Sequence, residues 1–252
     1  MIDLSLPPAG VELLRVRHLS LRETAPPVPT HDEEQEMNRI WEDVTQANPL
    51  LFDGPVVGCV GWEWEEPHDL TLTWARTTYR FHGLRQVPGA PSLPAVFASV
   101  VQPDEDGRIL VGRMASSTAS PGRWQLPGGA VEPPAEDEVL DVPVLHGHAA
   151  RELAEETGLG TGPGELRLWR VTRRLNGDVG FLFAAPGLPA ALVRERYAEL
   201  AASETAAGRD PELAEIAFVG SLAELEALGG TYAEFVEPVV RHCAGTPPRL
   251  DA

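Results

Sequence analysis

The feature that most constrains the fold of this chain is a charged run, RELAEETGL, at residues 151–159. If the run is helical, Glu152, Glu155 and Glu156 follow one another at spacings of three and four residues and share one face. Like charges at that spacing repel, so a purely structural helix gains nothing from them. We therefore expect a helix over about residues 146–157 whose acidic face binds a cation. The alternative is an ordinary solvated helix surface.

The cations that suit such a face are Mg²⁺ and Mn²⁺, because hard carboxylate oxygens bind them together with waters and substrate phosphates. Two glycines of the segment LPGG, Gly128 and Gly129, allow a loop to turn tightly and bring its backbone close to the helix. Gly158 lies where a left-handed residue commonly ends a helix. Arg151 is expected to hold the carboxylates through charge-assisted pairs.

The two segments together resemble the signature of the Nudix hydrolases, G-x5-E-x7-R-E-U-x-E-E-x-G-U, with U an aliphatic residue. Residues 151–159 match it completely, and WQLPGG at residues 124–129 matches the usual start of this box. The resemblance implies an α/β/α sandwich with a loop–helix–loop metal site that hydrolyses a nucleoside diphosphate linked to another group. The residues that it places in the site are the metal ligands and catalytic residues Glu152, Glu155 and Glu156, the catalytic Arg151, and the substrate-binding Gly128 and Gly129.

The box departs from the family pattern in one respect. The pattern places the arginine 14 residues after the glycine, whereas Arg151 follows Gly129 by 22 residues. Eight extra residues therefore lie inside the box, and the position of its first glutamate is taken by Pro143. Either Glu136 or Glu138 replaces that glutamate, or its role is lost.

Further site residues are expected around this box, each with an alternative. Within the family a further carboxylate often comes from a late loop, and Glu212, as a metal ligand, or Glu215, as a water-activating base, is in that place; the alternative is an exposed loop carboxylate. Arg113 and Arg123 are candidates for gripping the diphosphate, since arginine binds phosphate well, or else they pair with nearby acids. His148, one turn before Glu152, either contacts phosphate or is a partly exposed histidine at the start of the helix.

The N-terminal segment bears on the substrate. Trp41, Asn48-Pro49, Phe52-Asp53-Gly54 and Thr77-Thr78-Tyr79-Arg80 are similar to the N-terminal region of Nudix UDP-sugar pyrophosphatases. This resemblance implies a fused module that shapes a sugar or base pocket, and a UDP-sugar as substrate with UMP and a sugar 1-phosphate as products. The alternative is that these aromatic residues belong to an ordinary core.

The remaining pattern predicts an α+β fold: a Nudix-type α/β/α sandwich with a mixed sheet and a smaller N-terminal α/β module. We expect a module over residues 1–92, a Nudix domain over 93–222 and a C-terminal helical tail over 223–252, with a proline-rich linker at 85–94. Strands are expected at 11–22, 95–101, 108–114, 166–175, 179–184 and 213–219. The second and third are expected to form a hairpin, and the fourth and fifth are expected to pair around the turn NGD. Helices are expected at 31–46 and 189–207.

Composition excludes several classes of function. With 38 acidic residues against 20 basic ones, the net charge of −18 argues against binding to nucleic acid or to an anionic membrane. The sequence contains no lysine, so a phosphate must be met by a metal ion or by arginine. Two cysteines, no long apolar run and no secretory leader indicate buried thiols in a cytoplasmic protein.

Other functions remain open on the sequence alone. The substrate could instead be ADP-ribose, a dinucleotide or a nucleoside triphosphate. A Nudix-like domain could also bind a nucleotide ligand without turnover, although the intact box and the lack of a basic domain favour an enzyme. The C-terminal stretch supplies either packing helices or a homodimer contact.

Overall fold

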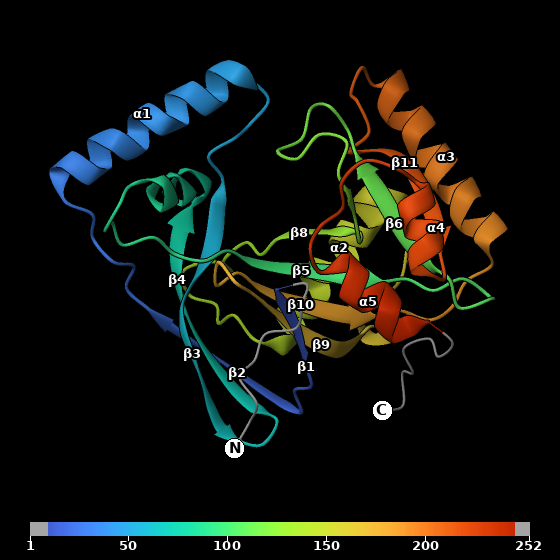
Figure 1. Ribbon diagram of the computed structural model, residues 1–252, viewed down its shortest axis with the longest axis horizontal. Coiled ribbons are helices and arrows are strands. Elements are labelled where there is room, and N and C mark those ends of the chain that lie inside the picture. The colour runs from blue at the N-terminus through green and yellow to red at the C-terminus, as the bar shows by residue number, and fades with distance from the viewer. Residues whose placement is uncertain (1–9, 245–252) are drawn as a thin grey trace.

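The computed structural model describes residues 10–244, and its centre is a mixed five-stranded sheet (Figure 1). In spatial order the strands are β1 (Val11–Leu14), β9 (Arg167–Arg174), β10 (Val179–Ala184), β5 (Val96–Val101) and β8 (Gly128–Ala130). Strand β10 pairs with β5 in parallel and with β9 antiparallel. The prediction that residues 166–175 pair with residues 179–184 is thus confirmed by the pairing of β9 with β10.

A second sheet of three strands has the order β11 (Leu213–Val219), β6 (Ile109–Met114) and β7 (Trp124–Gln125). The predicted hairpin of residues 95–101 with 108–114 is wrong, because β5 and β6 belong to different sheets. The antiparallel contacts lie after the end of β5, where Pro103 bridges Ile109 and the amide of Leu110 donates to the carbonyl of Gln102 at 2.9 Å. Both strands are almost entirely buried. Strands of this kind need partners and covering layers that a two-stranded hairpin cannot supply, so each takes its partners from elsewhere in the chain.

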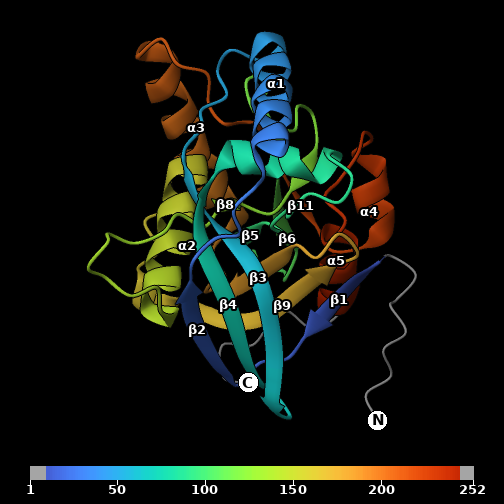
Figure 2. The same ribbon diagram turned by 90° about the vertical axis from the view of Figure 1, so that its left-hand side faces the viewer.

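Helices cover both sides of these sheets, as Figure 2 shows: α2 (Val142–Thr157) and α3 (Ala190–Ala206) lie on one side, and α4 (Leu222–Ala227) and α5 (Val236–Cys243) on the other. A short 3₁₀ turn, η2 (Pro163–Glu165), follows α2. Each side has its own apolar core. Leu145, Ala149 and Leu153 of α2 belong to one core, and Val236, Val239 and Val240 of α5 to the other. The mixed α+β fold predicted from the sequence is confirmed.

The N-terminal region adds a third sheet, in the order β2 (His18–Thr24), β4 (Asp69–Thr78) and β3 (Pro55–Glu66). Helix α1 (His31–Ala47) begins at a capping box made by Thr30 and Glu33, and it packs on the 3₁₀ helix η1 (Tyr79–Gln86). The single strand predicted over residues 11–22 is wrong. The extended conformation is interrupted at residues 15–17, which divides this segment into two strands. Strand β1 pairs with β9 in the central sheet, and β2 pairs with β4.

The N-terminal sheet is joined to the central sheet by backbone hydrogen bonds. The amide of Val57 donates to the carbonyl of Val131, and the amide of Cys59 donates to that of Pro94, both at 2.8 Å. Trp74 of β4 lies in the same apolar core as α2. Residues 85–94 are not a free linker, because Leu93 is buried in a core that it shares with Met37 of α1. The domain boundaries expected from the sequence stay a proposal.

Two expectations from composition can be compared with the structure. Cys59 and Cys243 are buried free thiols, and burial raises their pKa values to about 11 and about 12. Among residues 10–244, no helix is long and apolar enough to cross a bilayer.

Candidate active site

Helix α2 presents the acidic face. Asp141 caps its first turn by accepting a hydrogen bond from the amide of Val144, so the helix begins four residues before the predicted start at 146. Glu155 is exposed, Glu152 is mostly buried, and Glu156 is only 2% exposed. The solvent exposure of the three carboxylates therefore decreases from Glu155 through Glu152 to Glu156.

The loop Gly128–Gly129 lies directly against this face. The amide of Gly128 donates a 2.8 Å hydrogen bond to Oε2 of Glu156. Gly128 has a φ of +144°, and a Cβ there would lie 2.2 Å from the carbonyl oxygen of Ala98. A Cβ on Gly129 would lie 2.4 Å from Oε2 of Glu152. Gly128 is thus required by its φ and by its close approach to the neighbouring strand, whereas a side chain at Gly129 would displace the carboxylate of Glu152.

Burial and mutual repulsion raise the pKa values of the carboxylates. Burial, followed by the charges of Glu155 and Glu212, raises the pKa of Glu152 to about 7, against the opposing effect of Arg151. Burial and the charge of Glu212 raise the pKa of Glu156 well above its ordinary value. The pKa of Glu212 is raised by desolvation and by the charge of Glu155. Glu212 therefore lies close enough to the helical carboxylates to interact with them electrostatically, and its role as a metal ligand stays a prediction.

Arg151 lies at the centre of this cluster. Its Nη2 lies 3.2 Å from Oε2 of Glu132 and 3.7 Å from Oε1 of Glu152, and its Nε lies 3.9 Å from Oε1 of Glu155. Nη2 also donates to Nδ1 of His148 at 2.8 Å. The histidine is buried under the loop, not partly exposed, so the second expectation for it is wrong.

The carboxylate that meets Arg151 from the inserted segment is Glu132. Neither Glu136 nor Glu138 forms an ion pair within residues 10–244, and both are exposed. The expectation that one of these two takes the place of the first box glutamate stays a prediction. Glu132 comes only three residues after Gly129, at the start of the inserted segment.

The donor set fits a divalent cation. Oε1 of Glu156 is buried and has no hydrogen-bond partner among the described residues, although a buried carboxylate oxygen is costly without one. Within residues 10–244 no three acidic or other ligand side chains already converge on one point. Mg²⁺ does not require such a cage, since it keeps waters and uses substrate phosphates as ligands. The acidic face can therefore hold the ion together with a bound phosphate.

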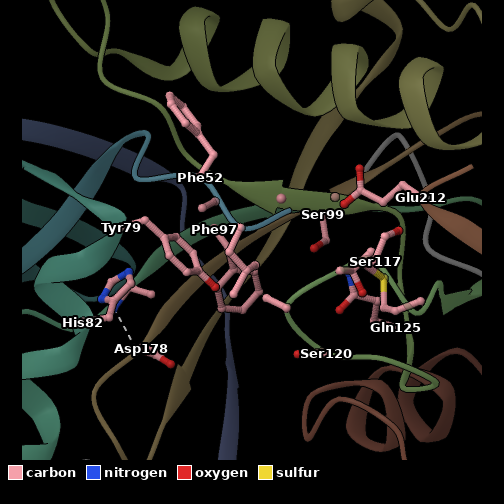
Figure 3. A pocket seen from close by; sticks show the side chains of 18 of the residues that line it. Phe52, Tyr79, His82, Phe97, Ser99, Ser117, Ser120, Gln125, Asp178 and Glu212 are labelled. Carbon is pink, nitrogen blue, oxygen red and sulfur yellow. Dashed lines mark hydrogen bonds between the residues drawn. The ribbon is translucent and has the colours of Figure 1, made fainter. Parts of the chain in front are cut away.

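A cleft of about 700 Å³ begins at the glycine loop and runs between the N-terminal region and the sandwich. Figure 3 shows Glu212 toward one end and Tyr79 and His82 toward the other, with Ser99 between them. Both parts of the chain contribute to its lining: Leu50, Phe52, Tyr79, His82 and Arg85 from the first, and Phe97, Ser99, Gln125, Gly128, Gly129, Asp178, Glu212 and Phe235 among others from the second.

The arginines of the cleft already have acidic partners. Arg85 forms an ion pair with Asp178, and Arg174 lies 3.7 Å from Asp178 and 3.4 Å from Glu234. The guanidinium of Arg174 also lies about 5 Å from the ring centres of Phe97 and Phe235, which are themselves 5.1 Å apart. The end of the cleft opposite the acidic helix is thus aromatic and close to neutral.

The structure brings some of the sequence-predicted residues together and separates others. Gly128, Gly129 and Glu212 line the cleft next to the helical glutamates. Arg113 lies 3.6 Å from Glu215, and Arg123 lies 2.6 Å from Glu234; these residues do not form the lining of the cleft. Their roles in the site remain predictions.

Several lining residues had no signal in the sequence. Ser117 and Ser120 come from an irregular loop, and Asp178 from a turn between β9 and β10. Gln125 is the exception, because its place inside WQLPGG puts it next to the glycine loop. Only tertiary folding brings the others to the cleft.

Helix α2 presents three glutamates, the glycine loop lies against it, and the cleft begins beside both. Together with the two sheets covered by helices, these features define a class of domain. The sequence model of the NUDIX domain matches residues 93–238, which is more than half of the chain. The chain belongs to the Nudix family.

The chain is also similar to several solved structures at low identity. A MutT protein from Methanosarcina mazei Go1 is 22% identical, with 60% of this chain and 93% of that one covered and a TM-score of 0.40. A NUDIX hydrolase from Nitrosomonas europaea is 19% identical, with 63% and 94% covered and a TM-score of 0.37. NrtR from Shewanella oneidensis is 16% identical, with 60% and 61% covered and a TM-score of 0.38. No curated protein matches the chain.

Proposed function

We propose that this protein is a Mg²⁺-dependent hydrolase that cleaves the diphosphate linkage of a nucleoside diphosphate joined to another group. The observation that carries the proposal is the crowding of Glu152, Glu155 and Glu156 behind the Gly128–Gly129 loop, at one end of the large cleft. This arrangement supports the proposal, because a diphosphate in the cleft would lie beside the glycine loop that contacts Glu152 and Glu156.

The residues divide the work as follows. Glu152, Glu155, Glu156 and Glu212 would hold the metal, which when bound neutralises phosphoryl oxygens and lowers the pKa of an attacking water. Arg151 positions two of these carboxylates. Glu215 pairs with Arg113 outside the cleft lining. We therefore favour Glu212 over Glu215 as the further carboxylate of the site.

The best candidate for the substrate is a UDP-sugar, which would give UMP and a sugar 1-phosphate. This finer assignment is supported by the resemblance of the N-terminal segment and by the presence of Phe52 and Tyr79 in the cleft lining. Trp41 does not line this cleft and packs against Tyr79 instead. ADP-ribose, a dinucleotide and a nucleoside triphosphate remain the alternatives. Use of Mn²⁺, a homodimer and a cytoplasmic location also stay predictions.

The test is a panel of diphosphates incubated with the full chain and Mg²⁺, scored by released phosphate or phosphomonoester. UDP-glucose, ADP-ribose, a dinucleoside polyphosphate and a nucleoside triphosphate make up the panel. We expect turnover of at least one of them that stops when EDTA removes the metal. If the protein binds members of the panel but hydrolyses none of them, it is a nucleotide-binding protein and the proposal is overturned. Turnover of ADP-ribose in preference to UDP-glucose would overturn only the choice of substrate.

A further inference from the structure

The segment that connects α1 to β3, residues 48–54, bridges the cleft. The side-chain amide of Asn48 donates hydrogen bonds to the carbonyl oxygens of Ser117 and Thr118, both at 3.2 Å, on a loop of the sandwich. The oxygen of the same amide accepts from the backbone of Leu50 at 3.2 Å. One side chain thus both shapes the segment and fastens it to the opposite wall.

The other end of the segment is fixed as firmly. The carboxylate of Asp53 accepts a 2.8 Å hydrogen bond from the amide of Arg80 and lies 3.1 Å from its guanidinium. The carbonyl of Gly54 accepts from the amide of Tyr79 at 2.9 Å. Because both ends are held, the middle of the segment is presented at the mouth of the cleft in a defined position.

The middle of the segment carries apolar side chains without an apolar partner. Leu50 is 70% exposed and Phe52 is 77% exposed, and both line the cleft. Phe52 lies on the side of Tyr79, as Figure 3 shows, at the aromatic end and away from Glu212. Because the segment is held at both ends, an aromatic ring on it offers a face to a ligand at little cost in backbone conformational freedom.

The surrounding wall indicates the chemistry of that ligand. Arg85 pairs with Asp178, and Arg174 lies near both Asp178 and Glu234, so most of the charge on this wall is paired. Aromatic rings of Tyr79 and Phe97 line this wall. Nearer to the acidic face of α2, the lining consists of the neutral hydrogen-bonding groups of Ser99, Ser117 and Gln125. Flat aromatic faces combined with neutral polar groups suit a planar, uncharged heterocycle joined to a ribose.

We propose that residues 48–54 form a cover for the base of the nucleoside, with Phe52 stacking on the ring and Asn48 as the positioning residue that fastens the cover. The inference rests on the proposed function, because it places the base at one end of the cleft and the diphosphate at the other. It assigns substrate recognition to the N-terminal region, while the acidic helix provides the cation site.

The test measures binding of the two halves of the substrate, which requires no turnover. The full-length protein with Mg²⁺ is titrated by calorimetry with UMP, AMP and glucose 1-phosphate, alongside Phe52→Ala, Phe52→Trp and Asn48→Asp. Base stacking on an aromatic side chain predicts that Phe52→Ala weakens nucleotide binding by about 10-fold or more, and that Phe52→Trp keeps it. Asn48→Asp loses both donors to the loop and is expected to weaken it as well. Glucose 1-phosphate is expected to respond to none of them.

The matched control is Trp64→Ala, which removes a partly exposed aromatic residue of β3 outside the cleft lining and is expected to change nothing in these titrations. The inference is overturned if the wild-type protein binds neither nucleotide, if Phe52→Ala binds both as well as the wild type does, or if that variant weakens glucose 1-phosphate equally. Stacking-dependent nucleotide binding without hydrolysis in the panel would leave the cover standing and refute only the hydrolase.

Discussion

At the scale of single residues, Glu156 is the clearest indication of a cation site. One of its oxygens accepts the amide of Gly128, and the other is buried without a partner in the described part of the chain. Such a group destabilises the folded protein unless something positive reaches it. Arg151 contacts Glu132, Glu152 and Glu155 but not this oxygen, so the proposed metal ion is the group that would compensate it.

The first prediction concerns these carboxylates. Glu155→Gln and Glu156→Gln each remove one negative charge from the metal face with almost no change in shape, so turnover with Mg²⁺ is expected to fall at least about 10-fold, in the range typical for loss of an electrostatic contact in an active site. Steady-state assays on the substrate found in the panel measure it, with circular dichroism to show that the fold is kept.

The control is Glu138→Gln, an exposed carboxylate of the inserted segment, which is expected to keep full activity. If both helical variants retain more than about a tenth of the activity, the assignment of these glutamates to the metal is wrong. A loss in Glu138→Gln would instead return the first box glutamate to the insertion.

At the scale of the element, helix α2 is positioned by its two ends. Asp141 caps the start, and Gly158 ends the helix with a φ of +74° next to α3. A Cβ at Gly158 would lie 2.6 Å from the carbonyl oxygen of Arg196. The glycine therefore sets both the end of the acidic helix and its contact with the neighbouring helix, which keeps the glutamates aligned with the glycine loop.

The second prediction compares two glycines of this helix. Gly158→Ala forces a side chain into the left-handed region and against α3, so the free energy of unfolding is expected to fall by about 1–2 kcal/mol or more. Gly147→Ala lies within the helix with no atom within 4 Å of the new Cβ, and it is expected to raise that free energy by about 0.5–1 kcal/mol. Urea titrations measure both, and equal effects of the two changes would contradict this account of the helix end.

At the scale of the whole molecule, the N-terminal region and the sandwich behave as one packed unit. They share an apolar core through Trp74, backbone hydrogen bonds through Val57 and Cys59, and the strand β1. Arg76 of β4 also donates from its guanidinium to the carbonyl oxygens of Pro134 and Ala135 in the inserted segment. The insertion in the Nudix box thus holds the N-terminal sheet close to the cleft.

The third prediction follows from this shared core. Unfolding is expected to occur in one cooperative transition, because exposing the N-terminal sheet would also uncover the core against which α2 packs. Scanning calorimetry measures it through agreement between the calorimetric and van't Hoff enthalpies. An early, separate transition that removes the N-terminal sheet while α2 stays protected from hydrogen exchange would show that the two regions are independent.

The acid excess also acquires meaning only at this scale. With a net charge of −18 and no lysine, the chain depends on arginine for every fixed positive side chain. The arginines expected at the phosphates, Arg113 and Arg123, each lie beside a glutamate, and those of the cleft are paired with Asp178. Attraction of an anionic substrate would therefore fall mainly to the proposed metal ion, which would locally reverse the field.

The sequence by itself determined the local features of this protein. The spacing of Glu152, Glu155 and Glu156, the glycine pair before them and the runs that form α1, α3, β10 and β11 are all encoded by short-range periodicity, and the family follows from the same box. Such features depend on neighbours a few residues apart, so no knowledge of the tertiary fold is needed to see them.

Only the tertiary structure decided which segments meet. The division of residues 11–22 between two sheets, the separation of β5 from β6 and the pairing of Glu132 with Arg151 depend on partners far along the chain. The same is true of the cleft, where Asn48 and Phe52 come from a segment that carries no catalytic motif. Strand pairing and burial are set by packing across the whole molecule, and a local pattern cannot specify a distant partner.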